Sequence, residues 1–506
     1  MTDRTEDLRA LEAIAELYRA ALPPGEVEEF PVRGMDEVAC AVWSVTLHPE
    51  HGSPGAGGHG YGATEQEARV GALGEMTEVT RSAATLAQLP RTTASYAELV
   101  RQQGRERVVD PRELALEAGS PYDDDRPLSW WPMTRLSDGE TVHVPAEFVA
   151  STGADVPSGP PAGGWLTTII SNGLGAGAGD QARERAVGHA LLELLQRDGN
   201  GLSFRAMDRG VVVDLDGIGD PGVRALLDRC AAAGVDVKVK LASTDFGIAD
   251  VYAVGTGADA HNPVMATACG EAAHPDRERA VRKALLEFVA ARTRKAFTHG
   301  PLEAVRDAAP PGYLERYLES TPLDRAGEEQ RALDAMVGWT GMDVAQLRSL
   351  LAGTVLSQRS TVALADLPST PVADSAALLA DVSGRLHAAG MDVLVADFPS
   401  ADGGVHAVKA VVPGLEVETM SYGRIGERGV RRLLERDDDR AGLVAVGSAP
   451  PAPGWAPVHL TAAAQERLGG PAWLDRARVD QVVGELYPLY REPGRHAAAL
   501  LHAGRV

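Results

Sequence analysis

The sequence predicts a mixed α/β fold in which strand, glycine loop and helix recur as a unit. Two observations support this prediction. The pattern Ala-x-x-x-Ala-Leu-x-Glu occurs three times, at 68–75, 186–193 and 280–287, each time after a segment that carries glycine. In addition, the chain has 506 residues, which is more than a single hydrophobic core of ordinary size accommodates, so two or three subdomains are expected.

The elements follow from periodicity along the chain. Apolar residues at helical spacing predict an amphipathic helix over 6–21, ended by Pro23-Pro24, and further helices between 301 and 353. The segments predicted as strands are 39–47, 165–170, 251–255, 392–398 and 405–412. The first three lie upstream of a glycine loop and a helix. The Pro- and Gly-rich segments 156–164 and 448–457 are predicted as surface loops or subdomain junctions.

Charge and cysteine content exclude several classes of protein. There are 71 Asp plus Glu against 49 Lys plus Arg, a net charge of −22, which disfavours nucleic-acid binding. Three scattered cysteines fit neither a disulfide framework nor a metal-binding C-x-x-C pair. No export signal or membrane-spanning apolar stretch is evident, so we expect a cytoplasmic protein without membrane contact.

The three repeat copies place a glutamate at the same position of each predicted helix. Alanines four residues apart leave a shallow face that can lie close to a sheet, and the glutamate lies near that face. If the three helices meet, their carboxylates require a cation between them, and hard oxygen ligands suit Mg²⁺ with bound phosphates. The alternative is that each glutamate lies on a solvated helix face of an Ala-rich chain, as surface glutamates commonly do.

Other nucleotide and metal motifs do not fit. The run from Gly173 would need a glycine at Ala178 to match the dinucleotide fingerprint G-x-G-x-x-G, and no P-loop motif occurs. No H-E-x-x-H or G-x-S-x-G motif is present either. We therefore interpret His189, on a predicted helix, as a hydrogen-bonded residue of a site wall rather than as a metal ligand.

Taken together, three blocks resemble the signature blocks of the YcaO family. They are GYGATEQEARVGALGEMTE at 60–78, SNGLGAGAGDQARERAVGHALLELLQRD at 171–198 and CGEAAHPDRERAVRKALLEFVAAR at 269–292. The resemblance covers about residues 35–430. It divides the chain into an N-terminal helix and lead-in (1–34), a core with the three ATP and Mg²⁺ blocks (35–300), the rest of the YcaO-like domain (301–430) and a C-terminal helical tail (431–506).

The resemblance implies mixed sheets with packed helices, ATP and Mg²⁺ as cofactors, and a set of site residues. The implied metal ligands are Glu75, Glu78, Glu193 and Glu287, and the implied nucleotide contacts are Ser171, Asn172, His189, Gln196, Arg197 and Arg292. No catalytic residue is assigned. This chain departs from the family pattern at Tyr61, Gln196 and Ala290, so one metal ligand is missing or is supplied by water.

The activity implied is ATP-dependent activation of a peptide amide. A cyclodehydratase of this kind phosphorylates a backbone amide oxygen of a ribosomally made precursor peptide and forms an azoline or a macroamidine in natural-product (antibiotic) biosynthesis. Two alternatives stay open: a thioamide-forming enzyme that uses sulfide with a TfuA-type partner, and a non-catalytic ATP-binding partner protein. The chain end and the early first block favour a stand-alone member of bottromycin type, and we expect a homo-oligomer with an accessory partner protein as a further option.

Overall fold

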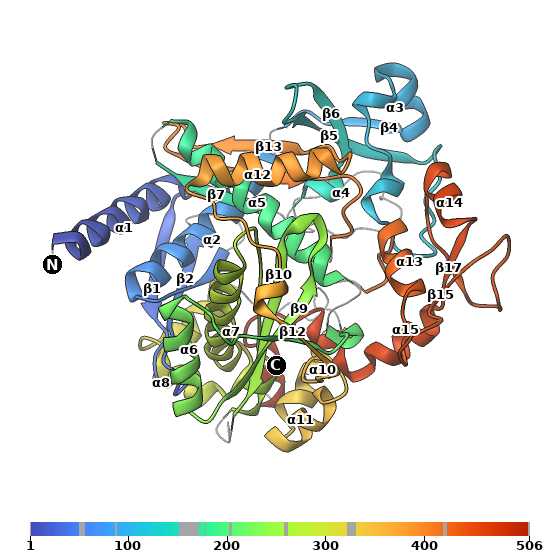
Figure 1. The fold of residues 1–506 in the computed structure, drawn as a ribbon. Helices are drawn as coiled ribbons and strands as arrows, with labels where there is room; N and C mark the ends of the chain where they lie inside the picture. The colour runs from blue at the N-terminus through green and yellow to red at the C-terminus, as the bar shows by residue number, and fades with distance from the viewer. Residues whose placement is uncertain are drawn as a thin grey trace. The chain divides into compact units, whose positions relative to one another are not determined.

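The computed structural model describes residues 2–49, 56–86, 89–150, 172–177, 179–201, 205–257, 262–320, 330–417 and 422–503. The chain forms two compact units that are each built from separate stretches of sequence. Unit 1 comprises Met1–Thr80, Asp208–Pro371 and Glu485–Val506, and unit 2 comprises Arg81–Met207 and Val372–Gly484. Both units contain helices and strands, which confirms the predicted mixed α/β class (Figure 1).

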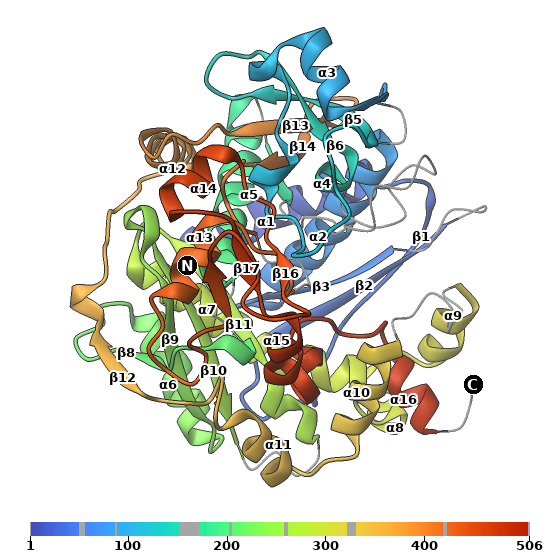
Figure 2. The same cartoon turned by 90° about the vertical axis from the view of Figure 1, so that its right-hand side faces the viewer.

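Two sheets form the framework of unit 1. The first is antiparallel, with the order β1 (Gly25–Pro31), β2 (Ala41–Pro49), β3 (Ala56–Gly62), and its strands run side by side in Figure 2. The second has the order β11 (Cys269–His274), β10 (Ala249–Thr256), β9 (Asp236–Ser243), β8 (Val211–Asp214), β12 (Ser360–Ala363). Only its last pair, β12 with β8, is parallel. The mixed strand directions agree with the predicted mixed sheets.

The helices of unit 1 are α1 (Thr2–Ala21), α2 (Glu65–Leu86, of which the part after Thr80 belongs to unit 2), α6 (Pro221–Ala232), α7 (Arg277–His299), α8 (Leu302–Ala308), α9 (Tyr313–Ser320), α10 (Gln330–Thr340), α11 (Val344–Leu351) and α16 (Ala497–His502). The long helix α7 packs along β11 and β10 (Figure 1). Its side chains Ala284, Phe288 and Val289 are fully buried in a core that also includes Val251 of β10. Asp276 starts α7, because its side chain accepts the main-chain N–H groups of the first turn.

Unit 2 is built on a larger antiparallel sheet, with the order β4 (Thr92–Ser95), β5 (Pro127–Arg135), β13 (Leu394–Pro399), β14 (Val405–Val411), β7 (Asn172–Ala176), and β6 (Thr141–Pro145) paired to β5. Its helices include α3 (Tyr96–Gln103), α4 (Ala146–Val149), α5 (Asp180–Asn200) and α12 (Ser375–Ala388). Helix α5 packs on β7 and β14, and α12 lies beside α5 (Figure 1). The packing of α5 on β7 is local in sequence, since only a few residues separate them.

The last part of unit 2 contains both strands and helices. These are α13 (Glu427–Leu434), β15 (Val444–Val446), β16 (Ala456–Pro457), α14 (Ala462–Leu468), β17 (Ala472–Leu474) and α15 (Arg476–Val483). The three strands form a small sheet with the order β15-β17-β16. The segment 431–506, expected as a helical tail, therefore also contributes this sheet. Its Pro-rich stretch 448–457 leads from β15 into β16 within that sheet, so it is a loop, as predicted, and not a subdomain junction.

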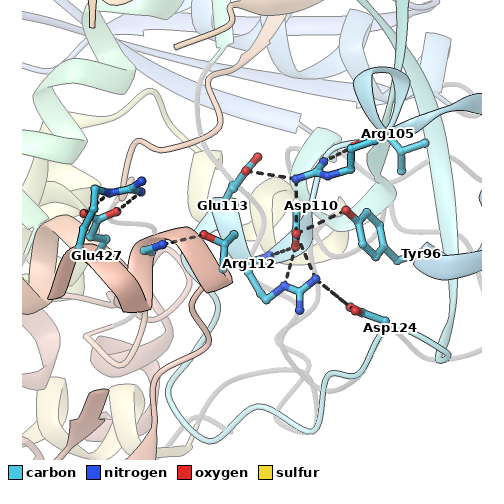
Figure 3. A network of polar contacts seen from close by, with 11 residues as sticks. Tyr96, Arg105, Asp110, Arg112, Glu113, Asp124 and Glu427 are labelled. Atoms are coloured by element: carbon cyan, nitrogen blue, oxygen red, sulfur yellow. Dashed lines mark hydrogen bonds and ion pairs between the residues drawn. The ribbon is translucent and has the colours of Figure 1, made fainter. Parts of the chain in front are cut away.

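A polar network in unit 2 ties three neighbouring segments together (Figure 3). Asp110 accepts two hydrogen bonds from the guanidinium of Arg112, at 2.8 and 3.0 Å, and Arg112 also contacts Asp124. The ring of Tyr96 lies 5.7 Å from the guanidinium carbon of Arg105 and 5.8 Å from that of Arg112. Every carboxylate at the centre of this network is paired with an arginine, so we interpret the network as one that stabilises the local structure of unit 2.

Most predicted elements are present with shifted ends. The predicted helix 6–21 lies inside α1, and the helical stretch after residue 301 contains α8 to α11. The predicted strands 39–47, 251–255, 392–398 and 405–412 correspond to β2, β10, β13 and β14. The predicted strand 165–170 and the predicted loop 156–164 lie outside the described residues.

One part of the predicted unit is wrong. The glycine segments before the repeat helices are predicted as loops, but Gly60, Gly173 and Gly270 lie in the strands β3, β7 and β11, and only Gly177 and Gly179 of the second segment come after its strand. The period-two pattern of small residues in these segments is that of a strand with a helix pressed onto it, and glycine suits the strand because a side chain would not fit. The repeating unit is thus a glycine strand followed directly by its helix.

Candidate functional site

The three repeat copies share one packing arrangement. A Cβ on Gly60 would lie 1.9 Å from the carbonyl oxygen of Ala68, and one on Gly173 would lie 1.9 Å from that of Ala186. A Cβ on Gly270 would lie 2.1 Å from the main-chain nitrogen of Phe288. Each helix therefore touches the backbone of its strand, through the small residues of the repeat. The prediction that the Ala face of each helix lies close to a sheet is confirmed.

Unit 1 brings two of the three repeat glutamates into one neighbourhood. Glu75 lies on α2, and its Oε2 accepts the main-chain N–H of His59 at 2.9 Å. Glu287 lies on α7, and its Oε2 accepts the phenol O–H of Tyr61 at 3.0 Å. His59 and Tyr61 lie two residues apart on β3, and side chains alternate between the two faces of a strand, so these two residues are on the same side of it. Strand β3 therefore bonds carboxylates from two helices that are about 200 residues apart in the chain.

Glu75 is exposed, whereas the electrostatics of Glu287 depart from those of a surface glutamate. Burial raises the pKa of Glu287 to about 7; the nearby cation Lys283 opposes this shift and the carboxylate of Glu271 adds to it. Burial also raises the pKa of Tyr61 well above its usual value, and the charges on Glu287 and Glu75 add to that effect. The phenol therefore keeps its proton and donates to the carboxylate.

Arg294 is the cation that both carboxylates influence. Its pKa is raised first by the charge on Glu492, and then, against the opposing effect of burial, by Glu75 and Glu287. Its Nη1 lies 3.2 Å from Oε2 of Glu492. Glu492 also contacts Nζ of Lys295 at 2.8 Å, so it balances two cations of α7. Residues Glu75, Glu287 and Arg294 together make a mixed-charge group in unit 1.

The remaining predicted residues of unit 1 lie in different surroundings. Glu78 is half-buried on α2, one turn beyond Glu75. Arg292 is 1% exposed, and its guanidinium binds Asp36 through two hydrogen bonds of 2.8 and 3.1 Å. This buried ion pair gives Arg292 a structural role that does not depend on a nucleotide. A contact of Arg292 with nucleotide stays a prediction.

Unit 2 carries the other predicted residues. Glu193 is half-buried on α5 and contacts Arg197 one turn later, at 3.2 Å. Gln196 is 8% exposed and Asn172, on β7, is 2% exposed. His189 is exposed on α5, and Ser171 lies outside the described residues. Glu193 and Arg197 thus form a half-buried ion pair, whereas Asn172 and Gln196 are buried.

The donor chemistry of these residues suits Mg²⁺ and phosphate. Carboxylate oxygens are the protein ligands that Mg²⁺ prefers, and it usually takes only one or two of them together with phosphate and water oxygens. In the described part of the chain no group of three or more His, Cys, Asp or Glu side chains is gathered closely enough to chelate a metal. The carboxylates of Glu75 and Glu287, each bonded to β3, are of the type that binds a metal whose other ligands come from phosphate.

Sequence reasoning did not assign roles to four residues of this neighbourhood. Arg294 follows Glu287 by seven residues, which is two helical turns, so its position on the same face of α7 could have been predicted. Tyr61 was noted only as a departure from the family pattern. His59 acts through its main chain, and Glu492 comes from the far end of the sequence; neither carries a signal in the sequence.

Comparison with known proteins identifies the family. The model of the family described as YcaO cyclodehydratase, ATP- and Mg²⁺-binding, matches residues 59–416. This is more than half of the chain, which therefore belongs to the YcaO family, and the resemblance seen in the sequence is confirmed. ATP and Mg²⁺ are the cofactors of this family.

Two curated relatives are similar along much of the chain. An uncharacterized protein of Methanothermobacter thermautotrophicus is 28% identical over 370 residues, which is 73% of this chain and 84% of the relative. An uncharacterized protein in the tfuA 3′ region of Rhizobium leguminosarum bv. trifolii is 27% identical over 317 residues, which is 61% of this chain and 66% of the relative.

Solved structures share the fold. A heterocyclase in complex with substrate and cofactor matches with a TM-score of 0.60 and 19% identity, over 85% of this chain and 55% of the heterocyclase. YcaO from Methanopyrus kandleri, bound with AMPPCP and Mg²⁺, matches with a TM-score of 0.52 and 21% identity, over 83% of this chain and 93% of that one. This chain thus spans about half of the heterocyclase's length. Within the described residues, every helix is too short or too polar to cross a membrane.

Proposed function

We propose that this chain is an ATP-dependent peptide cyclodehydratase. Its substrate would be a ribosomally made precursor peptide, and its product an azoline (thiazoline or oxazoline) or a macroamidine. The observation that best supports the proposal is the approach of Glu75 and Glu287 to one strand of unit 1, because two repeat copies that are far apart in the sequence then share one neighbourhood. Membership of a cyclodehydratase family supports the reaction class.

The reaction would proceed by activation of an amide oxygen. A nucleophile of the substrate attacks the amide carbonyl carbon, the resulting oxyanion takes a phosphoryl group, and phosphate then leaves as the C=N bond forms. Bound ATP supplies the phosphoryl group and Mg²⁺ neutralises charge on the phosphates. The net change in the peptide is loss of one water, and ATP becomes ADP and phosphate. The protein contributes mainly position and charge.

The proposed roles of the side chains follow from their chemistry. We propose Glu75, Glu78 and Glu287 of unit 1, and Glu193 of unit 2, as ligands of Mg²⁺ directly or through water; the inclusion of Glu193 rests on the sequence repeat. Arg294 is proposed as a cation for phosphate oxygens, since it already lies within the field of Glu75 and Glu287. Asn172, His189, Gln196 and Arg197 remain proposed nucleotide contacts, with Ser171 and Arg292.

Reconstitution tests this proposal. The purified chain is mixed with the precursor peptide encoded beside its gene, ATP and Mg²⁺, and the peptide is analysed by mass spectrometry while ADP is assayed. We expect loss of one water for each ring formed, with one ADP released. Glu287→Gln and Glu75→Gln should abolish both signals, whereas Glu303→Gln, an exposed glutamate of α8, should leave them unchanged.

Two other outcomes would replace the proposal. If ATP binds and the peptide mass stays constant, the chain is a non-catalytic ATP-binding partner protein. If the peptide changes only when sulfide is added, with exchange of one oxygen for one sulfur, the chain forms thioamides. The second outcome has an observation in its favour, because one relative is named for its place in a tfuA region. A TfuA-type accessory protein should then be included in the assay.

A further inference from the structure

Strand β3 is at the edge of its sheet in the described part of the chain. It pairs with β2 on one side, with Ser44 opposite His59 and Val42 opposite Tyr61. In an edge strand, alternate main-chain N–H groups point away from the partner strand and need another acceptor. Glu75 supplies that acceptor for His59. One repeat glutamate therefore completes the hydrogen bonding of the strand edge.

The second repeat glutamate is held by a side chain of the same strand. The phenol of Tyr61 donates to Oε2 of Glu287 at 3.0 Å, and the main-chain N–H of Glu271, on β11, is a second donor to that carboxylate. The ring of Tyr61 packs against the buried core of unit 1, which fixes the direction of its O–H. Donors from two strands therefore restrict the Glu287 side chain to one rotamer.

We propose that Tyr61 is a positioning residue, and that β3 sets the placement of the two carboxylates through the phenol of Tyr61 and the main-chain N–H of His59. The two donors belong to residues only two positions apart on one strand, so both carboxylates are held by the same short stretch of backbone, one by its main chain and one by a side chain. This inference rests on the proposed function, since it concerns how Glu75 and Glu287 meet Mg²⁺-bound phosphate.

The physical benefit is preorganisation. Two carboxylates placed together repel one another, and without fixed donors they would turn apart until a cation arrived. Donors that are already in place fix the rotamers of the two carboxylates, so these side chains lose less conformational entropy when Mg²⁺ binds. A neutral phenol does this without adding a positive charge that would compete with the metal. Loss of the phenol oxygen should therefore weaken binding that depends on Mg²⁺, and leave other binding alone.

The test is calorimetric titration of the full-length protein with ATP, with and without Mg²⁺. Tyr61→Phe keeps the ring and removes only the donor. We expect it to weaken ATP binding in Mg²⁺ about tenfold, as for a lost hydrogen bond to a charged group. Without Mg²⁺ its affinity should match the wild type. Tyr122→Phe is the matched control, because Tyr122 donates to Asp124 at 3.0 Å in unit 2, and it should not change ATP binding.

The outcomes separate this proposal from the proposed function. If Glu287→Gln weakens Mg²⁺-dependent binding and Tyr61→Phe does not, the positioning role is wrong and the site stands. If neither variant changes it, both the role and the site are wrong. Should Tyr61→Phe prove unfolded by its thermal melt, Tyr61→Gln replaces it, because the glutamine amide is neutral and also donates. A Tyr61→Gln variant that folds and binds Mg²⁺-ATP no better than Glu287→Gln would overturn the role.

Discussion

Glu287 is the residue on which the chemistry of unit 1 depends most. It combines a raised pKa of about 7 with two hydrogen-bond donors, from Tyr61 and from Glu271 on a neighbouring strand. Burial is the main cause of the shift, because a charged carboxylate loses solvation on leaving water. In the unliganded protein the folded state therefore binds a proton at Glu287 more tightly than the unfolded chain does.

Glu287→Gln should change how stability depends on pH. A carboxyl whose pKa is raised on folding contributes stability that is present below about pH 4.5 and is lost as pH rises through about 7. The neutral variant should escape this loss, so its stability relative to the wild type should rise by about 1–3 kcal/mol between pH 5 and pH 8. Urea unfolding at both pH values, with a chelator and no nucleotide, measures this. If the unfolding free energies of the two proteins changed in parallel with pH, the pKa of the Glu287 carboxyl would not be raised on folding.

Arg292 tests whether a predicted nucleotide contact is a structural residue instead. Arg292→Met leaves Asp36 buried without its partner, which should cost about 3–5 kcal/mol of unfolding free energy. Asp36→Asn should also destabilise the protein, and the double variant should lose less than the sum, as contacting residues do. Chemical denaturation provides the values. If Arg292→Met lowered ATP affinity of the folded protein while Asp36→Asn did not, Arg292 would be a nucleotide contact.

At the scale of the element, the recurring feature is a glycine strand covered by the Ala face of the following helix. The three helices start in different ways. Thr64 and Glu67 bond each other's main-chain N–H groups at the start of α2, Asp276 caps α7, and α5 begins after Gly179 without a side-chain cap. What the three copies share is therefore the strand contact rather than the helix start, and that contact fixes where each glutamate lies.

Gly60→Ala probes this contact directly. Its Cβ would lie 1.9 Å from the carbonyl oxygen of Ala68 and 2.0 Å from the nitrogen of Ala72, so α2 must move off β3. We expect a loss of about 1–3 kcal/mol, as for other overpacked sites. The control is Gly338→Ala in α10, where a Cβ meets nothing within 4 Å and alanine favours the helix. Thermal unfolding of both variants compares them; equal stability would mean that the helix adapts without cost.

At the scale of the whole molecule, neither compact unit is one continuous stretch of the chain. Unit 1 takes three separate stretches of sequence and unit 2 takes two. The repeat copies are divided as well: α2 and α7 carry Glu75 and Glu287 in unit 1, and α5 carries Glu193 in unit 2. A linear division of the sequence cannot express such an arrangement, because strand pairing connects segments that are far apart in the chain.

The net charge of −22 makes a prediction for the entire chain. Mutual repulsion among excess acidic groups disfavours the compact state, and salt screens it over about 10 Å at 0.1 M. The melting temperature should therefore rise between about 10 mM and 300 mM NaCl at constant pH, a range chosen around that screening length. Differential scanning calorimetry gives the values, and KCl should act alike. A fall in melting temperature with salt would show that the many ion pairs outweigh the net repulsion.

The sequence by itself determined the family, the class of fold and the repeat, because these depend on local spacing and on short ordered motifs. It also located Glu75 and Glu287 by their place in that repeat. Only the tertiary structure decided that the glycine segments are strands, that β3 joins two of the glutamates, and that Arg292 is bound to Asp36. Periodicity reports which face of an element is small or apolar, whereas the partner on the other side is chosen by packing between distant segments.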